Sequence, residues 1–196
     1  PFVSRLANSK SDPDILYAVG SSGVYKSIDF GGSWDSKPIS TRWGFWSGTD
    51  VEISLANPQI VWAGSGMTDV RSIQLSTDGG ESFDVTNNYP DEIGLATGIY
   101  SHPFQDSTAY VLFSISERPK VLRTTDLGNS WEDISGYGDE STSTGFPNVA
   151  VYSLLVMPHD TMTIWAGTEI GIVESTDNGQ NWQLLDSNLP SVSVWD

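Results

Sequence analysis

Residues 175–182 read Ser175-Thr176-Asp177-Asn178-Gly179-Gln180-Asn181-Trp182, and three earlier stretches of the chain repeat this pattern. Each copy has Ser or Thr, then Asp two residues later, Gly two residues after the Asp, and Trp or Phe at its end. We call the copies the repeat turns; their defining residues are Ser27, Asp29, Gly31, Trp34; Ser76, Asp78, Gly80, Phe83; Thr124, Asp126, Gly128, Trp131; and Ser175, Asp177, Gly179, Trp182. The four Asp residues stand about 50 residues apart, a period typical of propeller blades or stacked arrays.

Four short apolar runs lie within each period. They are rich in β-branched and aromatic residues and are bounded by Gly, Asn, Asp or Pro, which predicts strands joined by tight turns. Some runs, such as residues 60–63, are apolar without alternation, as expected when neighbouring sheets cover both faces. We therefore predict an all-β fold, a β-propeller of four-stranded antiparallel blades.

The spacing also predicts where the blades lie. We expect blade 1 at about 1–38, blade 2 at about 49–88, blade 3 at about 93–136 and blade 4 at about 147–188. Residues 191–196 resemble the first run of another blade. The expectation is therefore four blades plus the first strand of a fifth, within a larger propeller of about six to eight or more blades, whose remaining blades are a partner of this segment. A closed ring of four blades is the less favoured alternative.

Composition limits the possible partners. The chain has 25 acidic and 9 basic residues, a net charge of −16, so it would repel a nucleic-acid backbone. It has no Cys, which excludes disulfides and thiolate metal sites. No run approaches the roughly 18 apolar residues of a membrane-spanning helix. We predict no nucleic-acid partner, no membrane span, no metal and no cofactor.

The repeat turns themselves are predicted to be structural. Their Asp side chains can accept backbone N–H groups of the turn, and their Gly residues can adopt a positive φ. The terminal aromatic ring can be buried between adjacent blades. A calcium site is the alternative for these Asp residues, but they lack the dense run of acidic ligands of a calcium loop.

The pattern resembles the Asp-box, also called the bacterial neuraminidase repeat, and the resemblance covers essentially the whole chain. It implies that the motif lies between the third and fourth strands, on the rim away from the usual active-site face. The family includes sialidases, xyloglucan-cleaving endoglucanases, sortilin-type receptors and photosystem assembly factors. Residues 164–168 and 171–175 are most similar to the endoglucanase, sortilin-like and secreted bacterial branch, which implies an extracellular or cell-surface location in a bacterium.

The face opposite the repeat turns is then the candidate binding face. Residues 41–48 belong to the segment that is expected to connect blades 1 and 2. Within it, Arg42, Trp43, Phe45 and Trp46 are close together in the sequence. Flat aromatic rings suit stacking on sugars, and Arg can anchor a carboxylate or hydroxyl. These four residues are the predicted ligand site. The alternative is that the Trp rings fill the space between blades, since Trp is highly buried on average.

Three acidic residues, Asp69, Glu117 and Glu169, are the weak catalytic candidates on the same face. Glycoside hydrolysis needs two carboxyl groups about 5 to 9.5 Å apart across the substrate. Solvated surface roles are the alternative for each of them. A sialidase is not favoured, because the Arg-Ile/Leu-Pro motif of that family is missing and Glu117-Arg118-Pro119 is not it.

The sequence contains no motif that requires chemistry. We therefore expect a non-catalytic, secreted or cell-surface propeller module that binds protein or polysaccharide. The alternative is a glycoside hydrolase of the xyloglucanase-like type that acts on β-glucans, with other blades supplying part of its cleft.

Overall fold

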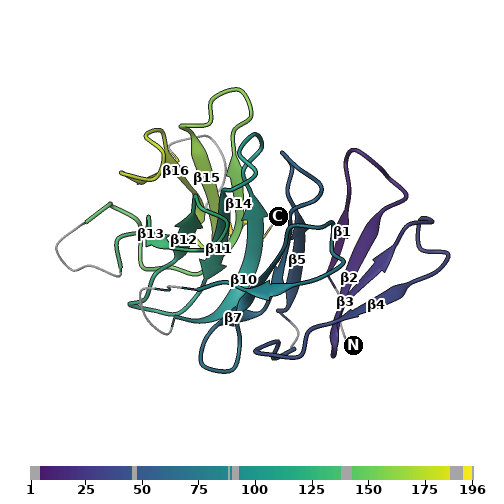
Figure 1. The fold of residues 1–196 in the computed structure, drawn as a ribbon. Coiled ribbons are helices and arrows are strands. Elements are labelled where there is room, and N and C mark those ends of the chain that lie inside the picture. The colour runs from purple at the N-terminus through teal and green to yellow at the C-terminus, as the bar shows by residue number, and fades with distance from the viewer. Residues whose placement is uncertain are drawn as a thin grey trace.

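The computed structural model describes residues 5–45, 48–87, 89, 93–137, 143–185 and 192–195. Within these residues the chain forms strands and no helix (Figure 1). The strands assemble into four antiparallel sheets in chain order. The first sheet contains β1 (Leu6–Asn8), β2 (Leu16–Gly20), β3 (Gly23–Ser27) and β4 (Asp35–Pro38), and the second contains β5 (Asp50–Ile53), β6 (Val61–Gly64), β8 (Ile73–Ser76) and β9 (Asp84–Val85). The third contains β10 (Gly94–Ser101), β11 (Ala109–Phe113), β12 (Val121–Thr124) and β13 (Glu132–Asp133), and the fourth contains β14 (Val151–Val156), β15 (Ile164–Thr168), β16 (Gly171–Ser175) and β17 (Gln183–Leu184).

One short strand links two of the sheets. Strand β7 (Gly66–Met67) leaves the second sheet and pairs with the start of β10, so that the third sheet has five strands. The repeat pattern predicts four strands per blade and contains no signal for β7.

The first strands of the sheets lie side by side. Strand β5 contacts both β1 and β10, and β10 also contacts β14. The remaining strands of each sheet follow outward in chain order, and the sheets fan out from β1–β4 to β14–β16 in Figure 1. Antiparallel sheets that radiate from a shared inner wall are the blades of a β-propeller. The predicted fold class is confirmed.

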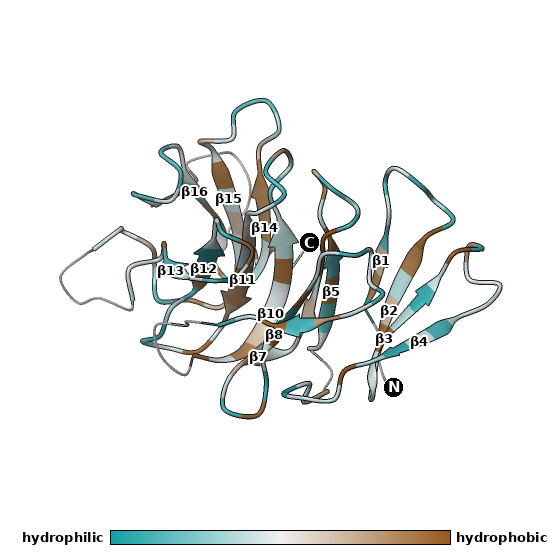
Figure 2. Ribbon diagram, in the orientation of Figure 1, coloured by the Kyte–Doolittle hydropathy of each residue, from teal (hydrophilic) through white to brown (hydrophobic). Residues whose placement is uncertain are grey.

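The hydrophobic core lies between consecutive sheets. One cluster joins the first two sheets around Tyr17 and Val61, and a second joins the next pair around Trp62 and Trp131. A third, around Trp182, joins the third and fourth sheets. Figure 2 shows that β11 and β15 carry hydrophobic segments, whereas the outer strand β4 is hydrophilic. Each blade therefore depends on its neighbours for the burial of its apolar faces.

All four repeat turns have the same hydrogen bonds. In the first, Ser27 Oγ donates to Asp29 Oδ1 at 2.8 Å and accepts the N–H of Gly31 at 2.8 Å. The backbone N–H and the hydroxyl of Ser33 donate to the two carboxylate oxygens of Asp29 at 2.8 and 2.7 Å. The other three turns repeat these bonds, with the side-chain amide of Asn181 in place of the hydroxyl in the last.

These hydrogen bonds favour the ionised form of the Asp residues. The side chain four residues after each Asp makes the largest contribution, which lowers the pKa of Asp29 to about 2. The pKa values of Asp78, Asp126 and Asp177 are lowered for the same reason. The carboxylates act as acceptors that hold the turn together.

The backbone of each repeat turn has two consecutive residues with positive φ. The positive φ predicted for the Gly is confirmed, with values of 73° in Gly128 and 86° in Gly31 and Gly179. The residue before the Gly shares it, with φ of 55° at Phe30 and 58° at Leu127. Left-handed conformations are costly for such side chains, so the hydrogen bonds and inter-blade packing must hold them in place.

The N–H of the residue after each Asp donates to the turn between the first and second strands of the same sheet. The pairs are Phe30 N with Asp14 O, Gly79 N with Gln59 O, Leu127 N with Ser107 O, and Asn178 N with Met162 O, at 2.8 to 3.0 Å. The repeat turns and these turns therefore share one end of the sheets. The turns between second and third strands lie at the other end, which we call the loop face.

Three repeat turns press against the preceding blade. A Cβ atom on Gly80 would clash with the ring of Tyr17, whose hydroxyl donates to Gly79 O at 2.6 Å. A Cβ on Gly128 would lie 2.5 Å from Thr86 Cγ2, and one on Gly179 would lie 2.9 Å from Ile134 Cδ1. The repeat turns are thus joints between blades.

Residues 192–195 run beside the fourth sheet. Val194 N donates to Thr168 O at 2.9 Å, and Ala96 N at the start of the third sheet donates in the same way to the O of Ser65, the residue directly after β6. Residues 191 and 196 lie outside the described residues. The sheets span residues 6–38, 50–85, 94–133 and 151–184, while the blade boundaries and the fifth-blade segment stay predictions.

Candidate functional site

The predicted ligand site lies on the loop face and is anchored in the protein core. Trp43 is only 5% exposed, and its Nε1–H donates to Gly20 O at 2.8 Å. Arg42 Nη2 donates to Thr68 O, and Phe45 packs against the core between the first two sheets. Trp46 lies outside the described residues. The Trp43 ring fills space between blades, and the binding role predicted for the four residues stays a prediction.

Two of the three catalytic candidates, Glu117 and Glu169, lie beside residues 148–150, just before β14. Glu117, after β11, accepts a hydrogen bond from Asn148 Nδ2, and Glu169, after β15, accepts the N–H of Ala150 at 3.1 Å. Asp69 is an exposed residue of the second sheet's loop. The structure therefore places Glu117 and Glu169 around residues 148–150 and Asp69 on another blade. Their catalytic roles stay predictions.

A buried lysine lies beneath these glutamates. Lys120 has no exposed surface; its Nζ donates to Ile115 O and lies 5.2 Å from the ring centroid of Tyr137. Burial lowers its pKa, while the charges of Glu117 and Glu169 oppose that shift. The sequence offered no signal for this burial, because Lys120 stands in a polar stretch before β12.

The inner wall of the propeller encloses a hollow of about 370 Å³, which we call the axial hollow. It is lined by residues of β1, β5, β10 and β14 and by the residues that flank them. Charged, aromatic and aliphatic groups come together in it, among them Lys10, Glu52, Tyr100 and Leu155. Cavities of about this size that mix apolar walls with a few polar groups are typical of small-ligand sites.

Two carboxyl groups of β5 bridge to the neighbouring inner strand. Asp50 Oδ2 accepts the N–H of Ile99 at 3.1 Å. Glu52 Oε1 accepts the hydroxyl of Ser101 at 2.7 Å and its N–H at 3.1 Å. Alternation along the strand places both carboxyl groups on one face of the second sheet.

The buried Glu52 carboxyl group has a raised pKa, in contrast to the Asp residues of the repeat turns. Burial raises its pKa to about 7; the Ser101 hydrogen bonds and Lys10 oppose the shift, while Asp50 adds to it. A carboxyl group with this pKa can donate or accept a hydrogen bond near neutral pH. Sequence reasoning missed Glu52, although an acidic residue within the apolar run 51–55 is a detectable signal.

The described residues include no group of three or more His, Cys, Asp or Glu side chains that could hold a metal ion. Nor does the described part of the chain contain a helix long and apolar enough to cross a membrane.

Comparisons with known proteins identify the fold. No protein-family model matches the chain. A search of curated proteins likewise found no match. Among solved structures, an ancestral GH74 enzyme has a TM-score of 0.68 at 18% identity, with 94% of this chain and 24% of that chain covered. The GH74 xyloglucanase of Xanthomonas campestris has a TM-score of 0.69 at 13% identity, covering 96% and 31%.

A further solved structure with a similar fold is not named as a GH74 enzyme. YCF48 from Cyanidioschyzon merolae has a TM-score of 0.57 at 17% identity, covering 97% of this chain and 59% of that chain. The present chain spans about a quarter to a third of the length of the GH74 chains it matches. Structural similarity at such low sequence identity establishes the fold but not the function. Function has to be argued from the residues of the site. The comparisons and the sheet topology agree that the chain has a β-propeller fold.

Proposed function

We propose that the chain is part of a non-catalytic, secreted or cell-surface propeller of the Asp-box type, and that it binds a protein or glycan ligand. The observation that carries this proposal is the axial hollow, where Glu52, Lys10 and Tyr100 come from three different blades. Such a mixture can hydrogen-bond a polar ligand and also offer it an apolar surface. The four repeat turns support the structural part of the proposal, because their Asp residues are already occupied by hydrogen bonds within the turn.

A glycoside hydrolase is the second candidate. It is favoured by the likeness to GH74 xyloglucanase structures and by the Glu52 carboxyl group, whose pKa of about 7 suits a general acid. A hydrolase also needs a second carboxyl group across the substrate. The catalytic candidates Asp69, Glu117 and Glu169 do not line the axial hollow, so they are tested as an acid–base pair of their own on the loop face.

Calorimetric titration with xyloglucan and its oligosaccharides, followed by assay of new reducing ends, separates the candidates. The binding proposal predicts heat of binding without new reducing ends. Glu52→Gln and Lys10→Met should weaken binding, whereas Glu132→Gln, which changes an exposed carboxylate paired with Arg123 on the outer strands, should leave it unchanged.

New reducing ends that disappear in Asp69→Asn or Glu169→Gln would establish the hydrolase instead. Absence of both binding and cleavage would rule out these glycans and leave another glycan or a protein as the ligand. Binding of a protein partner would then be tested with Glu52→Gln and Lys10→Met as the site variants and Glu132→Gln as the control.

A further inference from the structure

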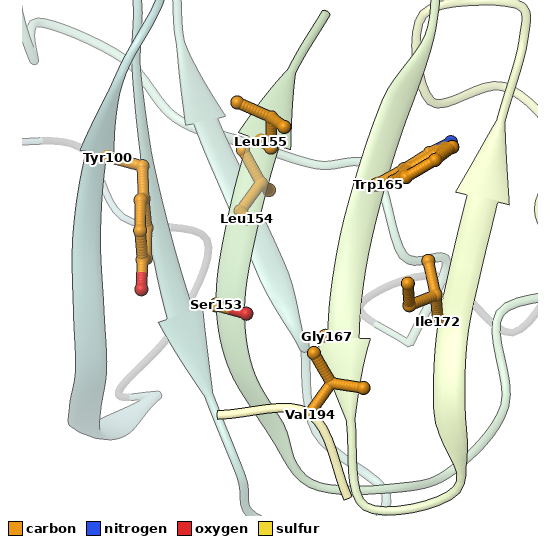
Figure 3. A pocket seen from close by; sticks show the side chains of 8 residues that line it. All are labelled: Tyr100, Ser153, Leu154, Leu155, Trp165, Gly167, Ile172 and Val194. Atoms are coloured by element: carbon orange, nitrogen blue, oxygen red, sulfur yellow. The ribbon is translucent and has the colours of Figure 1, made fainter. Parts of the chain in front are cut away.

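Two hollows beside the fourth sheet differ in the side chains that line them. Figure 3 shows the larger one, of about 350 Å³, whose wall is mainly apolar and includes Leu154, Trp165 and Val194. The smaller one, of about 90 Å³, lies between the third and fourth sheets at the end that carries the repeat turns, and we call it the joint pocket. Its described lining residues are mostly polar, and none of them is acidic, although the chain has 25 acidic and 9 basic residues.

A buried histidine lines the joint pocket. His102 is only 4% exposed, and its Nδ1 accepts the backbone N–H groups of Phe104 and Gln105, both at 3.1 Å. Burial lowers its pKa, and the positive charge of Arg123 adds to this shift, so the ring is neutral near neutral pH and carries its proton on Nε2. This Nε2–H has no acceptor among the described residues, so a ligand or a water molecule has to accept it.

The first two sheets show that this turn does not need a histidine. Ser9 and Ser54 stand at the positions that correspond to His102, since the N–H of each donates to the carbonyl six residues later, as that of His102 does. The Ser9 hydroxyl accepts the N–H of Asp12 at 3.3 Å, and the Ser54 hydroxyl accepts that of Asn57 at 3.3 Å. A serine hydroxyl is therefore sufficient for the turn, and what His102 adds is a second donor that serves the joint pocket.

Arg123 on β12 supplies the positive charge of the joint pocket. Its guanidinium is held in place on two sides, because Nε donates to Glu132 Oε1 at 2.7 Å and Nη1 donates to Asn178 Oδ1 at 2.7 Å. Burial raises the pKa of Tyr110, and the charge of Arg123 and a hydrogen bond from it oppose that rise. Because the Tyr110 oxygen accepts this bond, its own O–H is left as a further donor.

Donors from both sheets thus surround one small space. Gln105 Oε1 accepts the Thr108 hydroxyl at 3.0 Å, which leaves the amide NH₂ of Gln105 as a donor, and Thr161 adds a hydroxyl from the fourth sheet. A volume of about 90 Å³ is that of about three water molecules, which suits one small charged group and not a sugar ring. We propose that the joint pocket binds a single oxyanion group, a carboxylate or a phosphate, with Arg123 and His102 as its main donors.

Titration with sodium phosphate and, separately, with sodium acetate at constant ionic strength tests the proposal. Proton–nitrogen NMR follows the His102 imidazole and the backbone amide of Asn178, and saturable shifts of both are expected with at least one of the two anions. His102→Ser and Arg123→Met should each weaken binding about tenfold, the loss expected for one hydrogen bond to a charged group. Lys26→Met is the matched control, because Lys26 faces Tyr17 on the first sheet as Arg123 faces Tyr110 on the third, and it should bind as the wild type does.

Shifts that do not saturate with either anion, or equal affinity in the wild type and His102→Ser, would show that water alone fills the joint pocket and would overturn the proposal. Near-ultraviolet circular dichroism on each variant checks that the blades are intact. If Arg123→Met does not fold, His102→Ser decides the test, because Ser9 and Ser54 complete the same turn in the first two sheets. This proposal and the ligand-binding proposal can fail separately, because the joint pocket and the axial hollow share no lining residue.

Discussion

Alanine at the glycines of the repeat turns measures how tightly each turn is packed on the blade before it. Gly128 and Gly31 have similar backbones, with φ of 73° and 86°. An added Cβ at Gly128 would lie 2.5 Å from Thr86 Cγ2 and 3.3 Å from Trp62 Cζ3, whereas at Gly31 the nearest atom is 3.6 Å away. The left-handed strain is therefore shared, and only Gly128→Ala adds an inter-blade clash.

The expected magnitudes follow from these two effects. A left-handed alanine costs about 1 to 2 kcal/mol. Overpacking adds about 1 to 3 kcal/mol at Gly128, because Thr86 Oγ1 is held by a hydrogen bond of 2.8 Å to Ile73 O and cannot move freely. Gly128→Ala should thus lower the free energy of unfolding by about 2 to 5 kcal/mol, and Gly31→Ala by about 1 to 2 kcal/mol.

Urea unfolding followed by tryptophan fluorescence and far-ultraviolet circular dichroism is the assay, since coincidence of the two probes tests for a single transition. The same denaturant slope in all three proteins would show that the midpoints report stability. Equal losses in Gly128→Ala and Gly31→Ala would refute the conclusion that the turn glycine is needed for inter-blade packing.

Three other predictions concern buried polar groups and pH. Trp182→Phe should lower the free energy of unfolding by about 1 kcal/mol more than Trp131→Phe does, measured by urea unfolding. The reason is that Trp182 Nε1 donates to Ile134 O and Gly179 O, while Trp131 Nε1 has no partner among the described residues. Equal losses in the two variants would contradict this. Glu52 binds its proton more tightly in the folded state, so the free energy of unfolding should fall by up to about 3 kcal/mol as pH rises from about 4.5 to 7. Glu52→Gln should remove this pH dependence. An unchanged pH dependence in the variant would contradict the raised pKa of Glu52. The pKa of the Asp29 carboxylate is lowered to about 2, so its contribution to stability is present above about pH 4 and is lost as pH falls toward 2. Asp29→Asn should therefore lose less stability than the wild type between about pH 4 and 2, measured by urea unfolding at a series of pH values. The same loss in both proteins would contradict this role of Asp29.

The fold could be predicted because its information is local and repeated. Turn chemistry around Asp78 or Asp177, strand-length apolar runs and a constant period all indicate blades without any knowledge of tertiary contacts. The two consecutive left-handed residues were missed, because a turn tolerates Phe30 or Leu127 in that conformation only when contacts outside the local sequence hold it.

The candidate sites were harder to predict, because they depend on contacts between blades. Trp43 is a buried ring whose N–H is bound to the first blade, which agrees with the space-filling alternative for these rings, and the binding role of residues 42–46 stays a prediction. Glu52 acquires its pKa only where β5 meets β10, and Lys120 is buried only when the loop after β11 folds over it. A sequence pattern shows which residues occur but does not show which blades bring them together.

Amide hydrogen exchange at the four turn glycines tests most directly whether the repeat turns are joints between blades. Each glycine N–H donates to the Ser or Thr hydroxyl of its own turn at 2.8 or 2.9 Å, so the local hydrogen bond is the same in all four. Gly80, Gly128 and Gly179 are buried against a preceding blade, and Gly31 is partly exposed. We predict that the first three exchange only through global or blade-level unfolding, and that Gly31 exchanges faster through local opening. Equal protection of all four, or fast exchange at Gly128, would contradict the role of the repeat turns as inter-blade joints.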